Sequence, residues 1–130
     1  MKRTPTIVTA AVIERDGCLL VTRRLEGTHL AGCWEFPGGK CEEGEMPEHC
    51  LARELREELG IEAAVGCEAH RTLYEYGERA LDLRFFNCEI VGEPQPLLGQ
   101  QIRWVARDVL RTLEFPPADA ELVDTLVRTG

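Results

Sequence analysis

The chain lacks any apolar run long enough to cross a bilayer, which takes about 20 residues as a helix. Residues 1–5 (MKRTP) lead into a strand-like segment and carry no apolar core with a small-residue cleavage site, as a signal peptide would. We therefore expect a cytoplasmic protein with no membrane partner. Repeats, linkers and low-complexity tracts are also missing, so the 130 residues predict a single domain, 1–130, large enough to bury a core.

Positive charge is in short supply. Lys and Arg number 15 against 23 Asp and Glu, which gives a net charge of −8. Such a surface repels the phosphates of nucleic acids, so we expect no nucleic acid polymer as a partner. An anionic substrate would need local help from metal ions and a few arginines. Hydrophobic content of 44% and charged content of 29% otherwise describe an ordinary globular chain.

The six cysteines form no C-x-x-C pair and no cluster with the ligand spacing of a zinc site. In a reducing compartment we expect all six to be free thiols that fill small spaces. Cys33 and Cys41 flank a glycine-rich segment. Modification of these thiols could therefore disturb activity without either residue being catalytic.

Residues 38–61 predict a glycine loop followed by a short helix. Pro47 suits the first turn of that helix, where its missing N–H costs nothing, and Gly60 suits the position just beyond the end. An apolar stripe at i, i+4 and i+8 is formed by Leu51, Leu55 and Leu59. Three carboxylates at i, i+3 and i+4 share another face: Glu54, Glu57 and Glu58.

Carboxylates at this spacing repel each other by about 0.2–0.5 kcal/mol per pair on an isolated helix. They become favourable together when they bind a hard divalent cation such as Mg²⁺ or Mn²⁺, which takes oxygen ligands. A solvated acidic face is the ordinary alternative. The register of the whole segment distinguishes the two interpretations.

The segment matches every fixed position of the pattern G-x5-E-x7-R-E-U-x-E-E-x-G-U, in which U is aliphatic. The matching residues are Gly39, Glu45, Arg53, Glu54, Leu55, Glu57, Glu58, Gly60 and Ile61. This pattern is the Nudix box, and the chain resembles the Nudix hydrolases. Four further features are similar to the MutT branch of that family: Arg23–Arg24, His29, residues 34–39 (WEFPGG) and residues 115–118 (FPPA). The resemblance therefore covers nearly the whole chain.

Strands interleaved with helices are predicted along the rest of the chain. Apolar runs or alternation predict strands over 6–13, 18–24, 62–76, 80–91 and 101–106, a helical turn over 107–113 and a closing helix over 120–128. The strand over 6–13 is expected to be buried on both faces. This order favours an α/β fold with a mixed sheet covered on both sides. It agrees with the α/β/α sandwich that the resemblance implies.

The resemblance implies hydrolysis of a nucleoside triphosphate to its monophosphate and pyrophosphate, with Mg²⁺ or Mn²⁺ as cofactor. The leading substrate is 8-oxo-dGTP, in sanitation of the nucleotide pool, and the alternative is CTP, dCTP or a modified cytosine nucleotide. Implied metal ligands are the Gly38 carbonyl and the carboxylates of Glu54, Glu57 and Glu58. Glu45 and Arg53 are implied to brace the loop against the helix, which makes Arg53 part of the catalytic set.

Substrate contacts are implied for eleven residues: Arg24, His29, Glu35, Phe36, Gly38, Gly39, Lys40, Tyr76, Leu83, Phe115 and Asp119. Ordinary roles stay open for several of them. Arg24 could be a surface arginine at a strand end, His29 a solvated loop residue, and the aromatic residues part of the core.

Asp119 stands where MutT relatives selective for 8-oxoguanine have asparagine. An ionised carboxylate only accepts hydrogen bonds, so it favours a base edge rich in donors, such as the cytosine N4 amine or the guanine N1–H and N2 amine. A buried, protonated Asp119 could also donate. Capping of the last helix is a competing role.

Leu98 stands where MutT-like proteins often carry a glutamate that serves as an extra ligand or a general base. An apolar side chain can do neither. The base is then Glu54, or Glu93 or another loop acid, or turnover is lower. A nucleotide-binding module that has lost catalysis is the alternative from another class. Both a monomer and a homodimer fit the sequence.

Overall fold

A computed structural model of the chain describes residues 4–129. The strands are β1 (Thr6–Arg15), β2 (Cys18–Arg23), β3 (Trp34–Glu35), β4 (Gly38–Lys40), β5 (Glu62–Tyr76), β6 (Arg79–Val91) and β7 (Ile102–Ala106). The helices are α1 (Pro47–Leu59) and α2 (Ala120–Thr129), with 3-10 turns η1 (Arg107–Thr112) and η2 (Pro117–Asp119). Neither helix within the described range has the length and apolar character needed to span a membrane.

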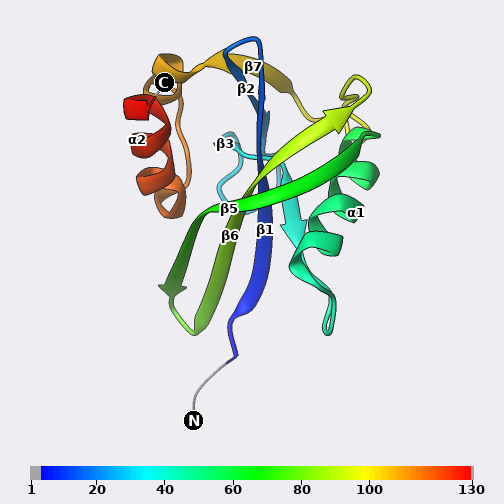
Figure 1. The fold of residues 1–130 in the computed structure, drawn as a ribbon. Helices are drawn as coiled ribbons and strands as arrows, with labels where there is room; N and C mark the ends of the chain where they lie inside the picture. The colour runs from blue at the N-terminus through cyan, green and yellow to red at the C-terminus, as the bar shows by residue number, and fades with distance from the viewer. Residues whose placement is uncertain (1–3, 130) are drawn as a thin grey trace.

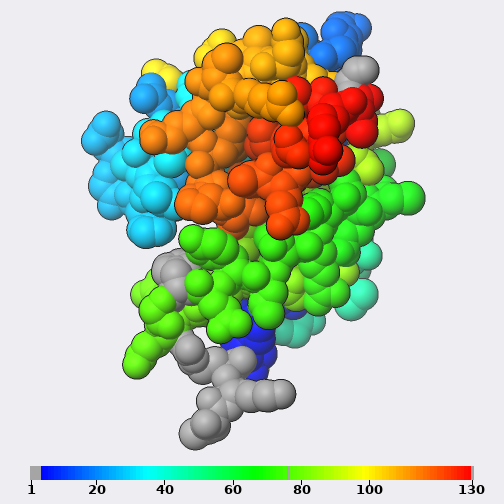
Figure 2. All heavy atoms as spheres, turned by 90° about the vertical axis from the view of Figure 1, so that its left-hand side faces the viewer, coloured from blue at the N-terminus to red at the C-terminus, as the bar shows by residue number. Residues whose placement is uncertain are grey.

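The strands form the mixed sheet that the sequence predicts. β1 pairs in parallel with β6 and antiparallel with β2 and β4. β5 is antiparallel to β6, and β3 and β7 both pair antiparallel with β2. α1 lies on one side of this sheet and α2 on the other (Figure 1), which confirms the α/β/α sandwich. Seen from the α2 side, α2 and the segment before it lie above the β5–β6 hairpin (Figure 2).

Two hydrophobic cores lie on the two faces of the sheet. Alternate residues of β1 serve both, because successive side chains of a strand point to opposite faces. Val12 packs in the core that contains the α2 residues, whereas Ala11 and Ile13 pack in the core beneath α1. The expected burial of β1 on both faces is therefore confirmed.

α1 begins and ends where its sequence signals predict. Pro47 occupies the first turn, and Gly60 has the left-handed backbone conformation (φ 66°) that favours glycine. The Gly60 N–H donates to the Arg56 carbonyl at 3.0 Å. The three leucines of the stripe are fully buried, as predicted: Leu51, Leu55 and Leu59.

The glycine loop differs from the prediction because part of it is a strand. Residues 38–40 form β4, in which Gly38 pairs with Ala10 of β1. A Cβ on Gly38 would overlap the Thr9 carbonyl and the Ala10 backbone. Glycine therefore allows the two backbones to approach, and this contact between distant segments has no local sequence signal.

The expectation of six free thiols is wrong at one pair. Cys41 and Cys50 form a disulfide, with their Cα atoms 5.3 Å apart. Free thiols are found at Cys18, Cys33, Cys67 and Cys88. The disulfide joins the residue after β4 to the start of α1, because the intervening loop turns back on itself.

We predict that Leu55→Ala lowers the free energy of unfolding by about 2–5 kcal/mol, because it leaves a cavity beneath α1. Urea denaturation followed by circular dichroism measures this change. Leu98→Ala is the matched control, since that side chain is 52% exposed, and it should alter stability by less than about 0.5 kcal/mol. Equal losses for the two variants would contradict the packing described for α1.

Candidate active site

A cavity of about 1300 Å³ is lined by β1, β3, β4, the β5–β6 hairpin, η2 and one residue of α1. Many of the residues predicted to form the site line it: Arg24, His29, Glu35, Phe36, Gly38, Gly39, Lys40, Glu58, Leu83 and Asp119. Segments far apart in the sequence thus meet around one space. Because α1 and η2 lie on opposite sides of the sheet (Figure 1), the cavity joins an acidic end at Glu58 to a second end at Asp119.

One residue predicted to contact the substrate does not line this cavity. Phe115 does not line this cavity but stacks on Phe36, with ring centroids 5.3 Å apart, so it supports a wall from behind. The side chain of Tyr76 lies outside the described part of the structure, so its contact stays a prediction. The sequence analysis missed other lining residues on the β5–β6 hairpin, including Arg79 and Leu81. Their signal was the two-residue period that relates them to Leu83.

The acidic end brings Glu58 and Glu54 together. Burial first, and then the hydrogen-bonded Glu54 carboxyl group, raise the pKa of Glu58 to about 8. Glu54 packs against the backbone of Gly39, where a Cβ would overlap its carboxylate. The lack of a side chain at Gly39 therefore makes room for a carboxylate directly beside β4.

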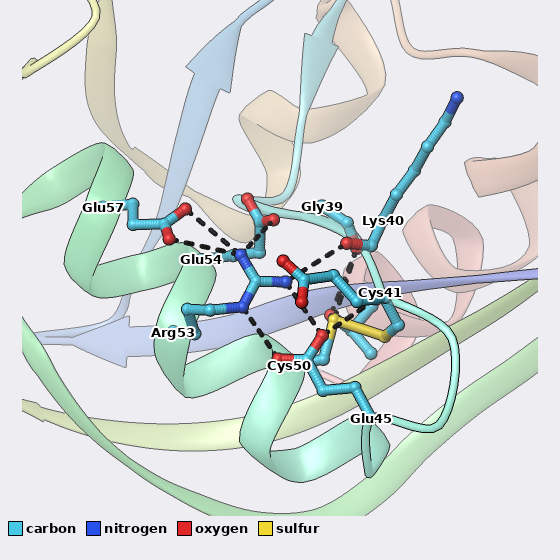
Figure 3. Close-up of polar contacts among 10 residues, drawn as sticks. Gly39, Lys40, Cys41, Glu45, Cys50, Arg53, Glu54 and Glu57 are labelled. Carbon is cyan, nitrogen blue, oxygen red and sulfur yellow. Dashed lines mark hydrogen bonds and ion pairs between the residues drawn. A yellow bond between two sulfur atoms is a disulfide. The ribbon is translucent and has the colours of Figure 1, made fainter.

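Arg53 lies at the centre of the remaining carboxylates (Figure 3). Its Nε and Nη2 atoms donate to the two oxygens of Glu45 at 2.7 and 2.9 Å. Its Nη1 atom donates to Glu54 at 3.0 Å and to Glu57 at 3.1 Å. Hydrogen bonds from Arg53 and from the Glu42 backbone N–H lower the pKa of Glu45 to about 2. Arg53 thereby ties the loop before α1 to the glutamates on the helix.

The donor set fits a hard divalent cation. It consists of oxygen atoms, and burial together with the neighbouring Glu54 carboxyl group disfavours the negative charge of Glu58, which a cation bound there would stabilise. The three glutamates do not converge on one point here, because Arg53 holds Glu57. Among residues 4–129, ligand atoms of three such side chains lie within 4.8 Å of one another at Cys41, Glu45 and Cys50 alone. A cation shared by Glu54 and Glu57 would replace their contacts with Arg53 Nη1.

The other end of the cavity contains a buried carboxyl group beside an ion pair. Asp119 is 4% exposed. Burial and the negative charge of Glu35 raise its pKa to about 7, against the opposing charge of Arg24. Arg24 donates to Glu35 at 2.9 Å and to the His29 carbonyl at 2.6 Å. Burial also raises the pKa of Glu35. Near neutral pH, Asp119 therefore exchanges between a form that donates and a form that only accepts.

Asp119 is the last residue of η2, and its backbone N–H donates to the Pro116 carbonyl at 3.0 Å. Within residues 4–129, its carboxylate accepts no hydrogen bond from the first turn of α2. The side chain instead lines the cavity. The geometry therefore favours the substrate-contact role over the capping role.

Leu98 lies in the loop that covers the C-terminal end of α1. Its N–H donates to Gln100 Oε1 at 2.9 Å, and Gln100 Nε2 donates to the Glu58 carbonyl at 3.2 Å. Glu93 is held by Arg15 at 2.7 Å. Ala10 is the partner of Gly38 in β1, and Arg15 lies five residues beyond it. Five residues of a strand span about 17 Å. This distance disfavours Glu93 as the base and leaves Glu54 as the alternative closest to β4.

Comparison with known proteins identifies the family. The model of the NUDIX domain matches residues 8–125. The chain belongs to the Nudix family. It is 40% identical to the 8-oxo-dGTP diphosphatase of Haemophilus influenzae, over 92% of this chain and 90% of that protein. It is 37% identical to the CTP pyrophosphohydrolase of Escherichia coli, with the same two coverages. The solution structure of the E. coli ORF135 protein superposes with a TM-score of 0.85 at 35% identity, covering 96% and 90% of the two chains.

The Nudix assignment confirms the predicted family and its MutT-like branch. It also places the observed contacts within the box: the Arg53–Glu45 pair spans its loop, and Glu54 meets its first glycine, Gly39. The roles of the individual residues remain predictions, which the variants below test.

We predict that the Glu45–Arg53 contact contributes stability that acid removes. The pKa of Glu45 is lowered from 4.5 to about 2 in the folded chain. The contribution is therefore present above pH 4.5 and is lost as the pH falls toward about 2. Urea midpoints measured between about pH 6 and pH 2 should fall less steeply for Glu45→Gln than for the wild type. Glu43→Gln, an exposed change in the same loop, should follow the wild type, and a parallel course for all three proteins would refute the contact's role.

Proposed function

We propose that this Nudix hydrolase converts a nucleoside triphosphate to its monophosphate and pyrophosphate, with 8-oxo-dGTP as the leading substrate and Mg²⁺ as the cofactor. The observation that carries the proposal is the cavity itself. It joins Glu58, which is hydrogen-bonded to Glu54 in a set of carboxylates suited to a cation and phosphates, to a buried hydrogen-bonding residue suited to a base, Asp119. The 8-oxo-dGTP diphosphatase and CTP pyrophosphohydrolase relatives support the same class of reaction.

The box residues would hold the cation through Glu54, Glu57, Glu58 and the Gly38 carbonyl. A divalent cation held there would supply neutralisation of charge on phosphate oxygens and a lower pKa for the attacking water. Arg53 and Glu45 orient the glutamates, as partners in the outer shell of metal sites do. Glu54 is our choice for the general base, since Leu98 has no proton acceptor and Arg15 holds Glu93 away from β4.

Asp119 favours 8-oxoguanine when it is protonated. The 8-oxoguanine edge presents an acceptor at O6 beside a donor at N7–H, and a carboxylic acid can match both at once. We take this edge, rather than the N1–H and N2 amine, to face Asp119. An ionised Asp119 there loses its donor to O6, and it instead matches the N4 amine of cytosine, which only donates. The cytosine nucleotides are therefore the second candidate substrates, and the observation that favours them is the aspartate itself. Arg24 and Glu35 would set the balance between the two forms.

We predict that Glu57→Gln lowers kcat for 8-oxo-dGTP about 100-fold or more at saturating nucleotide, because it removes an anionic ligand. Chelation of divalent cations should abolish turnover in the wild type. Monophosphate and pyrophosphate products are quantified by ion-exchange chromatography. Glu48→Gln is the matched control, because Glu48 is an exposed acid of the same helix. Metal-independent turnover, or nucleotide binding with no turnover at all, would defeat the proposal and favour the binding module.

We predict that the ratio of kcat/KM for 8-oxo-dGTP to that for dCTP falls as the pH rises from about 6 to about 8. The sign follows from the raised pKa of Asp119, about 7: below it the carboxyl group donates, and above it the group only accepts. Taking the ratio cancels pH effects on the cation and the triphosphate. Asp119→Asn should keep the 8-oxo-dGTP preference and remove the pH dependence. A pH-independent ratio in the wild type would show that Asp119 does not read the base.

A further inference from the structure

We propose that Cys41 and Cys50 form a reversible redox site that sets the cation affinity of the Nudix box. The oxidised pair holds the loop in the conformation that the box requires, and reduction releases it. This inference rests on the proposed function in one respect, the cation site at the box glutamates.

The disulfide closes the loop that carries the brace. Residues 41–50 run from the end of β4 to the first turn of α1, and Glu45 lies within them. An oxygen of Glu45 lies within 4.8 Å of both sulfur atoms. The close-up shows the disulfide directly beside the Arg53–Glu45 contact (Figure 3). Glu45 is the box carboxylate on this loop, whereas the other box glutamates lie on α1. Motion of the loop therefore moves Glu45 directly.

The same disulfide contacts the strand side of the site. The Cys50 sulfur lies 3.4 Å from Thr9 Oγ1 and 3.9 Å from the Gly39 carbonyl oxygen. Thr9 Oγ1 also donates to that carbonyl at 3.4 Å. The covalent link thus connects both halves of the cation site, the glycine backbone of β4 and the helix that bears the glutamates.

The two cysteine residues differ in exposure. Cys50 is fully buried, whereas Cys41 is partly exposed. A thiol reductant therefore attacks at Cys41 Sγ: the S–S bond breaks, a mixed disulfide forms, and Cys50 leaves as a thiolate beside the Thr9 hydroxyl. A second thiolate attacks the mixed disulfide and releases the Cys41 thiolate. The two reductant thiols lose two electrons and become a disulfide, and their two protons pass to Cys41 and Cys50.

Two features favour a reversible bond: the reducing compartment that we expect for this chain, and the exposure of Cys41. Disulfides within a reducing compartment are usually transient and redox-sensing, and the partial exposure of Cys41 gives a reductant direct access. Reduction frees the loop without removing Glu45. We therefore expect a smaller loss of affinity than the 10–100-fold that loss of an outer-shell partner causes.

The test compares oxidised and reduced forms of the full chain. Thiol titration in denaturant should count four thiols in the oxidised protein, from the free cysteines of the structure, and six after dithiothreitol treatment and desalting. Mn²⁺ binding is then measured by electron paramagnetic resonance without nucleotide. We expect the reduced protein to bind Mn²⁺ about three- to tenfold more weakly. Reoxidation by oxidised glutathione, which runs the exchange in reverse and is itself reduced to two thiols, should restore the affinity.

Three variants keep the result interpretable. Cys41→Ser should bind Mn²⁺ as the reduced wild type does in either condition, and Cys50→Ala should behave alike. Cys67→Ser changes an exposed free thiol and should keep the full redox response. Circular dichroism checks that each protein is folded, and the wild-type comparison needs no substitution.

Several outcomes would overturn the redox site. Six titratable thiols in the oxidised protein would exclude the disulfide. Equal Mn²⁺ affinity in both forms, with a change in thermal midpoint alone, would make the bond a structural staple. Both results leave the proposed function intact. Absence of Mn²⁺ binding in either form would overturn the cation site of the proposed function together with this inference.

Discussion

The close approach of β4 to its neighbours is the constraint on which the rest of the site depends. Gly38 lets the strand pair with β1, and Gly39 lets the Glu54 carboxylate lie against its backbone. A side chain at Gly38 would push β4 away from β1, and a side chain at Gly39 would displace the Glu54 carboxylate. The cavity, the acidic cluster and the loop that starts at Cys41 all take their positions from this contact.

Near that contact the fold brings together carboxyl groups whose negative charges repel one another. Glu58 and Glu54 meet at one end of the cavity, and Asp119 and Glu35 at the other. One member of each pair is held by an arginine, since Arg53 donates to Glu54 and Arg24 donates to Glu35. Such local conflicts cost stability and are typical of sites selected for binding. The rest of the sheet is ordinary apolar packing on two faces.

Elements with local signals were predictable from the sequence. α1 is specified by Pro47, Gly60 and a leucine stripe, all within one segment, and β1 by an unbroken apolar run. β4 was not, because glycine has no strand preference and its pairing depends on Thr9 and Ala10, about 30 residues earlier. The Cys41–Cys50 bond also escaped prediction, since the pair has no spacing signal and depends on how the loop turns back.

The site follows the same division. The box register indicated that Arg53 meets Glu45, because this contact is local to one loop and helix. Which of the box glutamates bind a cation stays a prediction. The neighbours that adjust Asp119 come from the far end of the sequence, so a raised pKa could not be derived from residues 115–118 alone. Glu93 was a candidate base because it lies close to Leu98 in the sequence. That proximity gave no indication of its ion pair with Arg15, a residue far away along the chain.

The parallel pairing of β1 with β6 has a consequence for how the chain is made. Ala10 pairs with Phe85, so the central ladder cannot form until most of the polypeptide has left the ribosome. Until then, the apolar β1–β2 hairpin has an open edge and no parallel partner. During synthesis this hairpin is therefore exposed to aggregation or chaperone capture.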